Sequence, residues 1–275
     1  MQFEAYAAVL QNSEGGLYQV LDAAELVAKE PRLSDCADQF TGGIFSPGDS
    51  VGDCRDFARR VATALTERFD VQFQFETGVT GFNHQAGRIA AVNTDKGPIK
   101  AEAVVLATGV ATPSLTAPLG FRPNIYPVKG YSGTWHIQDP ARIPQLPFVD
   151  ETQLVAVASY GGRLRVTALA EFAGHDTTLP PEQTALLHYY VARTFGDAVN
   201  VQSAEYWTGL RPSTPSGPPY LGRIHGIENL WINAGHGQLG WTMAAGCADL
   251  IATRLLGRTT KLNGVSATAG WLEDI

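Results

Sequence analysis

An arginine in the last quarter of the chain stands where it could bind a negatively charged ligand. Arg211 lies between Leu210 and Pro212 in the stretch GLRPSTPSG, so the backbone beside it is constrained. A guanidinium held in place can bind a carboxylate through two parallel hydrogen bonds. A structural ion pair with an Asp or Glu side chain would account for this residue equally well. The residues alone leave both interpretations open.

Glycines precede the apolar C-terminal helix in the stretch NAGHGQLGW. Gly235, Gly237 and Gly240 remove side chains from the approach to the helix start, where unpaired N–H groups and the helix dipole favour negative charge. Reduced flavin carries negative charge over its N1 and C2 carbonyl region, so such a helix start is suited to hold its ring. Ordinary turn formation also places glycines before helices. Both interpretations again stay open.

Composition narrows the classes of ligand. The 275 residues carry a net charge of −7 and show no cluster of Lys and Arg, which argues against nucleic acid and favours small ligands. The three cysteines are Cys36, Cys54 and Cys247, without C-x-x-C spacing, so neither a metal site nor a disulfide framework is indicated. The first residues lack a signal-peptide pattern, and no run is long and apolar enough to cross a bilayer. We therefore expect a cytoplasmic protein, either free or peripheral on the inner face of the cytoplasmic membrane.

The first half of the chain alternates helix and strand patterns. Residues 53–69 predict an amphipathic helix capped by Asp53. Its apolar stripe comprises Phe57, Val61, Ala64 and Leu65. The stretch VQFQF, residues 71–75, alternates apolar and polar and predicts a half-buried strand. Residues 87–109 predict a hairpin that leads into the apolar run 103–107, which is typical of a buried parallel strand.

Later residues predict a second layer and two helices. The stretches YSGTWHI, LVAVASY and RLRVTALAE predict strands of a mostly antiparallel sheet. The stretch PPEQTALLHYYVARTFG predicts a helix with Leu186, Leu187, Tyr190 and Val191 facing inward. The final helix, 241–256, is expected to end at Gly257 and to share one apolar face among Ala244, Cys247, Ala248, Ile251 and Leu255.

Several ordered motifs resemble those of a known family. They are GLYQVLDAAELVAKEP, TGGIFSPGDSVGDCRDFARRVA, YPVKGYS, YWTGLRPSTPSGPPYLGR and LWINAGHGQLGWTMAAG. In this order they resemble the D-amino acid dehydrogenase small subunit, a family of flavoproteins grouped with D-amino acid oxidase, glycine oxidase and sarcosine oxidase. The resemblance implies an FAD oxidoreductase of amino acid catabolism. It would oxidise a D-amino acid to an imino acid, which water converts to a 2-oxo acid and ammonia, and pass electrons to a quinone or another carrier.

The resemblance also implies roles for particular residues. Arg211 would bind the substrate carboxylate, and Tyr131 and Tyr160 would lie at the substrate. Glu171 is a further candidate at the cavity, although a structural role remains open for Tyr160 and Glu171. The residues implied to bind the cofactor are Val79, Ala107, Thr108, Gly109, Lys129, Gly130, Gly235, His236, Gly237, Gln238, Leu239, Gly240, Trp241 and Thr242. No residue is assigned as a general acid or base, and His236 is as well suited to hydrogen-bond backbone or flavin.

One departure from the family pattern bears on the cofactor. Family members open with a strand, a G-x-G-x-x-G turn and a helix that receives the FAD pyrophosphate, and this chain has no such unit, so about a third of the usual protein is absent. A fragment or misplaced start, a separate polypeptide that supplies the unit, and a degenerate relative without flavin all remain open. An accessory or non-catalytic fragment is therefore the alternative function.

The expected fold is α/β with α+β character. An incomplete FAD-binding, Rossmann-like domain would comprise residues 1–125 and 207–275. A substrate-binding domain dominated by antiparallel sheet would comprise residues 126–206.

Overall fold

The computed structural model describes residues 5, 7–9, 18–258, 261–262 and 265–266, and it divides into two compact units. The first unit takes its described residues from Met1–Arg59, Gly130–Ala170 and Thr177–Gly209. The second takes them from Arg60–Lys129, Glu171–Asp176 and Leu210–Ile275. In the described part of the chain, no helix combines the length and the apolar character that crossing a membrane requires.

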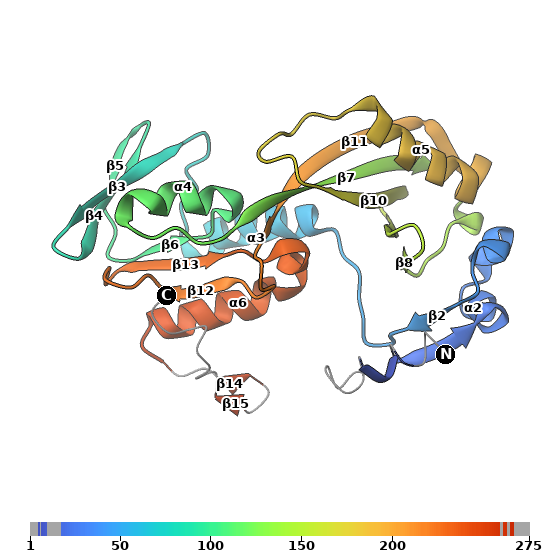
Figure 1. Cartoon of the computed structure of the whole chain (residues 1–275), viewed down its shortest axis with the longest axis horizontal. Coiled ribbons are helices and arrows are strands. Elements are labelled where there is room, and N and C mark those ends of the chain that lie inside the picture. The colour runs from blue at the N-terminus through green and yellow to red at the C-terminus, as the bar shows by residue number, and fades with distance from the viewer. Residues whose placement is uncertain (1–4, 6, 10–17, 259–260, 263–264, 267–275) are drawn as a thin grey trace. The chain divides into compact units, whose positions relative to one another are not determined.

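A five-stranded sheet forms the body of the first unit, in the order β11-β7-β10-β9-β8 (Figure 1). Its strands are β7 (Tyr126–Ile137), β8 (Phe148–Asp150), β9 (Val155–Tyr160), β10 (Arg163–Glu171) and β11 (Val199–Ser213). The pairs β8–β9 and β9–β10 are antiparallel, which confirms the strands and the antiparallel sheet predicted from sequence.

Helix α5 (Pro181–Phe195) packs on this sheet. Its buried Leu187, Tyr190 and Val191 join a core that includes Trp135, Leu164, Val166 and Val199. The prediction for Leu186 was wrong, because its side chain is 56% exposed. Residues 187, 190 and 191 share one face at i, i+3 and i+4 spacing, whereas Leu186 is rotated away from it by about 100°.

The amino-terminal part of the first unit is a small hairpin with helices. Strands β1 (Gln19–Asp22) and β2 (Gly42–Phe45) pair antiparallel around helix α2 (Ala23–Lys29). Asp22 and Glu25 form a capping box at the start of α2, so each side chain accepts a hydrogen bond from the other's backbone N–H. The buried carboxylate of Glu30 accepts hydrogen bonds from the backbone of Gln145 and Leu146, at 2.8 and 2.9 Å. These bonds fix the hairpin to its unit.

The second unit contains the parallel strands. Strand β13 (Leu230–Ala234) lies between β12 (Tyr220–Arg223) and β6 (Val104–Leu106), antiparallel to the first and parallel to the second (Figure 1). The predicted parallel strand is therefore confirmed. Its predicted burial on both faces was wrong, because Val105, 41% exposed, and Ala107 are exposed whereas Leu106 is buried, and successive residues of a strand point to opposite faces, so only one face of β6 is covered.

Helix α6 (Gly240–Leu255) packs beside β12 and β13 and ends before Gly257, which has φ +66° as a left-handed stop. Its buried face is Cys247, Leu250 and Ile251. The predicted face was partly wrong, because Ala244, Ala248 and Leu255 are exposed. The buried residues again follow i, i+3 and i+4 spacing. Strands β14 (Lys261–Leu262) and β15 (Val265–Ser266) form a short hairpin after α6.

Helix α3 (Cys54–Phe69) begins as predicted, because the Asp53 carboxylate accepts hydrogen bonds from the backbone of Arg55 and Asp56. Its apolar stripe is not covered: α3 has no buried residue, and Phe57 and Val61 are exposed. The predicted strand at 71–75 was wrong, since these residues form no strand and pair with none in the described chain. A strand pattern cannot form a ladder without a neighbour.

A small antiparallel sheet, β3 (Val79–Gln85), β4 (Arg88–Thr94) and β5 (Gly97–Ile99), precedes β6 and confirms the predicted hairpin. Helix α4 (Thr112–Thr116) follows β6. The buried amide of Asn229 joins the small sheet to the parallel strands. Its oxygen accepts from Ile89 N at 2.8 Å, and its nitrogen donates to the carbonyls of Ile89 and Glu102 at 2.9 and 3.2 Å.

We expect Asn229→Ala to lower the free energy of unfolding by about 2–3 kcal/mol, because the buried N–H and C=O of Ile89 would lose their partner. Asn229→Asp should cost more, since a carboxylate oxygen would face two carbonyls. Asn83→Ala, at an exposed amide of β3, is the matched control and should stay within about 0.5 kcal/mol. Urea or thermal unfolding measures all three, and equal losses at Asn229 and Asn83 would contradict the role of the buried amide.

Candidate functional site

Two loops meet where the parallel strands end. Strand β6 is followed by Ala107, Thr108 and Gly109, and β13 is followed by the glycine stretch 235–240. Neighbouring parallel strands place their carboxyl ends at the same edge of a sheet, and in open α/β sheets ligands bind outside that edge. The structure therefore brings together two of the segments that the sequence predicts to bind the cofactor.

The glycines of these loops have conformations that a side chain would disturb. Gly235 has φ +93°, and a methyl group added there would lie 2.8 Å from Cγ2 of Thr214. Gly237 and Gly109 have φ +54° and +52°, in the left-handed region. A short 3₁₀ turn, Gly237–Leu239, then leads into α6. These glycines let the two loops pack closely against Thr214, Ser213 and Pro212, while Gln238 and Leu239 are exposed on the glycine loop.

Arg211 lies on the strand that borders both loops. A methyl group added at Gly109 would lie 3.8 Å from Cγ of Pro212, and one added at Gly237 would lie 3.6 Å from Oγ of Ser213. The end of β11, with Arg211 next to Pro212, is thus adjacent to both loops within the second unit. Burial lowers the pKa of the half-buried Arg211 guanidinium, yet an arginine remains a cation in a protein. A partly desolvated cation of this kind binds a carboxylate more strongly than one in water.

His236 lies inside the glycine loop. Burial lowers the pKa of its imidazole below the ordinary value, so the ring is neutral at pH 7. A neutral imidazole offers one donor and one acceptor. This state suits a hydrogen bond to backbone or ligand.

Lys129 is the buried cation of the second unit. Its side chain is fully buried, and its ammonium lies 2.7 Å from the Asp176 carboxylate and 3.9 Å from that of Glu171. Both carboxylates are partly exposed. These ion pairs hold the segment Glu171–Asp176 against the start of β7. Glu171, a candidate for the substrate cavity, is therefore also a partner of Lys129.

The other residues implied by sequence lie elsewhere. Tyr131 is buried in the core of the first unit, and Gly130 belongs to the same strand. Tyr160 ends β9 in that unit, where burial raises the pKa of its phenol. Val79 begins β3 and pairs with Thr94 in the small sheet. Gln238, Leu239, Trp241 and Thr242 are exposed on the glycine loop and the first turn of α6.

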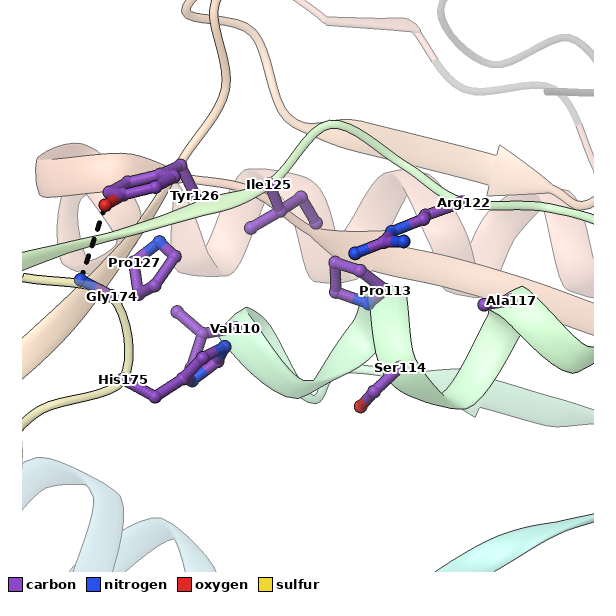
Figure 2. Close-up of a pocket in the computed structure, with 10 residues that line it drawn as sticks. All are labelled: Val110, Pro113, Ser114, Ala117, Arg122, Ile125, Tyr126, Pro127, Gly174 and His175. Carbon is purple, nitrogen blue, oxygen red and sulfur yellow. Dashed lines mark hydrogen bonds between the residues drawn. The ribbon is translucent and has the colours of Figure 1, made fainter.

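A cavity of about 400 Å³ lies beside the predicted cofactor segments (Figure 2). Val110 follows Gly109 directly, and Pro127 precedes Lys129 by two residues, so both of these segments contribute to its wall. The lining residues are Val110, Pro113, Ser114, Ala117, Arg122, Ile125, Tyr126, Pro127, Gly174 and His175. Tyr126 closes one side by accepting a hydrogen bond from Gly174 N at 3.3 Å (Figure 2).

Sequence reasoning missed this cavity. Two of its polar side chains, Arg122 and His175, come from loops more than fifty residues apart and carry no motif or period. Only the segment Glu171–Asp176, held by Lys129, brings His175 to the cavity wall (Figure 2). A long-range ion pair of this kind leaves no local signal in the sequence.

Comparison with known proteins assigns the fold to a family. Residues 2–254 match the family described as FAD dependent oxidoreductase, so the chain belongs to this family, and the family is FAD-dependent. D-amino acid dehydrogenase from Cereibacter sphaeroides is 43% identical over 249 residues, which cover 90% of this chain and 57% of the relative. The enzyme of the same name from Rhizorhabdus wittichii is 42% identical, with 90% and 59% covered. These relatives confirm the resemblance and support an oxidoreductase, while the chain spans less than two thirds of their length.

Solved structures show the same fold. Glycine oxidase from Geobacillus kaustophilus matches with a TM-score of 0.80 and 24% identity over 95% of this chain and 70% of its own. L-proline dehydrogenase from P. horikoshii matches with a TM-score of 0.79 and 21% identity, over 94% and 69%. The mixed α/β fold predicted from sequence is confirmed. The stretch 235–240, GHGQLG, has the spacing G-x-G-x-x-G and lies between strand β13 and the start of helix α6, and glycine-rich turns of this kind hold dinucleotide cofactors in α/β folds.

The two ion pairs of Lys129 give a testable difference. Asp176→Asn should lower the free energy of unfolding by about 1–3 kcal/mol, because the buried ammonium would lose its partner at 2.7 Å. Glu171→Gln should cost less than about 1 kcal/mol, because its carboxylate is 3.9 Å away. Thermal unfolding compares the matched pair, and proteolysis within 171–176 should rise for Asp176→Asn alone. Equal effects of the two substitutions would show that distance from Lys129 does not decide the stability of this segment.

Proposed function

We propose that this chain forms part of an FAD-dependent dehydrogenase that oxidises D-amino acids to 2-oxo acids and ammonia. One observation carries the proposal: the strand end bearing Arg211 borders both glycine loops at the carboxyl edge of the parallel strands. A cation that can bind a carboxylate thereby lies close to two glycine-containing loops. The relatives named D-amino acid dehydrogenase support this choice of substrate class.

In this proposal each part of the chain has a defined task. Arg211 binds the substrate carboxylate through two parallel hydrogen bonds and so orients the α-carbon. The segments 107–109, 129–130 and 235–242 hold the flavin, and Val79 contacts its adenine end. FAD, when bound, accepts the hydride from the α-carbon. The substrate ammonium first gives one proton to water, because the nitrogen lone pair must be free for the hydride to leave; no residue is assigned as a base, and water then hydrolyses the imino acid.

In this proposal the two predicted domains bind different molecules. Residues 1–125 and 207–275 serve the cofactor, and residues 126–206, with Tyr131 and Tyr160, serve the substrate. Electrons leave the reduced flavin for a quinone or another carrier rather than for oxygen. A cytoplasmic location, with contact at the inner face of the membrane, would give the protein access to a membrane quinone.

The activity is tested in a complemented protein. The chain is co-expressed with the part of the C. sphaeroides relative that it does not match, then purified with added FAD. D-alanine and L-alanine are supplied with a soluble quinone, and the flavin spectrum, 2-oxo acid and ammonia are measured. We expect a yellow protein that forms pyruvate from D-alanine and reduces the quinone. A colourless protein would favour the accessory role, and turnover of L-alanine alone would refute the stereochemistry.

The role of Arg211 gives a sharper prediction in the same complemented protein. Arg211→Ala should lower kcat/KM for D-alanine by an amount equivalent to about 2–5 kcal/mol, because a buried carboxylate would lose its cation. Arg211→Lys should also be strongly impaired, since an ammonium cannot form the two parallel bonds. Flavin content should not change. Arg88→Ala, at an exposed ion pair with Glu228, is the control and should keep full activity. Loss of flavin in both Arg211 variants would instead indicate a structural ion pair.

A further inference from the structure

The cavity of the second unit contains two basic side chains that have no protein partner. Arg122 and His175 line it from loops far apart in the sequence, and in Figure 2 they lie on opposite sides of it. Neither side chain forms an ion pair or a hydrogen bond with a described residue. By contrast, the exposed Arg88 pairs with Glu228 at 2.6 Å. Arg122 and His175 are both exposed, so a ligand can reach them from solvent.

A tyrosine of the cavity wall offers a third polar group. The hydroxyl oxygen of Tyr126 accepts a hydrogen bond from the backbone N–H of Gly174 at 3.3 Å, so its own O–H remains able to donate (Figure 2). None of the described residues that line the cavity carries a carboxylate. The carboxylate of Asp176, beside His175 in sequence, is bound to Lys129 at 2.7 Å. The polar groups of this cavity therefore favour a negatively charged acceptor.

The rest of the wall is apolar and held in place. It comprises Val110, Pro113, Ala117, Ile125 and Pro127. Ile125 belongs to a buried core cluster, and the backbone N–H of Asn124 donates to the Tyr220 hydroxyl at 3.1 Å, so the loop that carries Arg122 is fixed. A cavity of about 400 Å³ with an apolar wall and a few polar groups has the usual character of a small-molecule site.

We propose that this cavity binds a small organic carboxylate with an apolar body, such as a branched aliphatic acid. The carboxylate accepts hydrogen bonds from the Arg122 guanidinium and from an N–H of His175, and the apolar body lies against the proline and aliphatic wall. Sugar phosphates fit this cavity less well, because the apolar wall would leave their hydroxyl groups without partners. The inference goes beyond the proposed function, since no residue assigned there to substrate or flavin is among the lining residues.

Occupancy of the cavity stabilises one segment of the chain. Gly174 and His175 belong to Glu171–Asp176, which the buried Lys129 holds through its ion pair with Asp176. A ligand that bridges His175 and Arg122 ties this segment to a second, fixed loop. Because the ligand binds only the closed arrangement, it lowers the population of opened forms. The segment should therefore be more protected when the cavity is filled.

Binding is measured on the full chain by isothermal titration calorimetry with isocaproate as the probe. Three related molecules separate its parts: isohexanol lacks the charge, isohexylamine reverses it, and acetate lacks the apolar body. We expect saturable one-to-one binding of isocaproate with a dissociation constant of about 1 mM or lower. Each of the other molecules should bind at least tenfold more weakly, because it lacks one of the two parts that the cavity recognises.

Matched substitutions test the residues. Arg122→Gln should weaken isocaproate binding by about tenfold and His175→Gln by about threefold, because each removes a donor to the carboxylate. Ala117→Leu should abolish binding, since Ala117 is an exposed residue of the wall and the larger side chain would fill the space. Arg88→Gln and His84→Gln, at exposed positions outside the cavity, are the controls and should leave the affinity unchanged. Circular dichroism of each variant checks that the fold is kept.

Amide hydrogen exchange locates the ligand independently of any variant. Isocaproate should slow exchange in 171–176 and in the loop 120–126, which carry His175 and Arg122. Exchange in the small sheet, 79–99, should stay unchanged, because no residue of this sheet lines the cavity. Protection of the small sheet alone would contradict the site.

The outcomes are distinct. Equal binding of isohexanol and isocaproate, binding unaffected by Arg122→Gln, or no saturable binding below about 10 mM would overturn the proposal. Loss of binding in Arg211→Ala with full binding in Arg122→Gln would assign the acid to the proposed substrate site and overturn it as well. Displacement of isocaproate by added FAD would also overturn it, because the cavity would then belong to the cofactor. Binding that depends on Arg122, in a chain that oxidises no D-amino acid after complementation, would support this site and refute only the proposed function.

Discussion

The parallel pairing of β6 with β13 is the constraint on which the candidate site depends. These strands are separated by more than a hundred residues, yet their pairing brings 107–109 and 235–240 to one edge. Asn229 stabilises this arrangement, since its buried amide bonds both to the small sheet and to the carbonyl of Glu102 that precedes β6. The adjacent end of β11 then places Arg211 within reach of both loops. Without the parallel pair, the two loops and the end of β11 would not lie together.

Features decided by local backbone chemistry could be predicted from sequence. The cap at Asp53 and the stop at Gly257 need only their neighbours, and each is found as expected. Burial was less predictable, because it depends on which partner covers an apolar face. Residues 71–75 have the alternation of a strand, but no neighbouring strand pairs with them in the described chain. The apolar stripe of α3 has no buried residue. Leu186 was assigned to the wrong face of its helix, because adjacent helical residues point in directions about 100° apart.

The cavity shows why the remainder of the site could not be predicted. A fully buried ammonium is costly to desolvate, so Lys129 requires carboxylates close by, and the chain supplies them from Glu171 and Asp176 more than forty residues later. The motif containing Lys129 suggested a place near the cofactor, but no local pattern could reveal these partners. Their ion pairs set the position of His175 and Gly174, and hence the shape of one cavity wall. The same segment therefore links a stability constraint to the geometry beside the proposed flavin site.

The edge strands of the second unit differ in whether they carry a charge or a proline. At one edge β12 carries Arg223 and packs beside α6, and at the small sheet β5 carries Pro98. Both are common protections against unwanted pairing. Strand β6 has neither a charge nor a proline within Ala103–Ala107, although its other edge is engaged with β13. Val105 and Ala107 are thus exposed on one face of a strand whose outer edge also has no paired strand among the described residues, so the apolar pattern of this strand exceeds the burial that the described chain gives it.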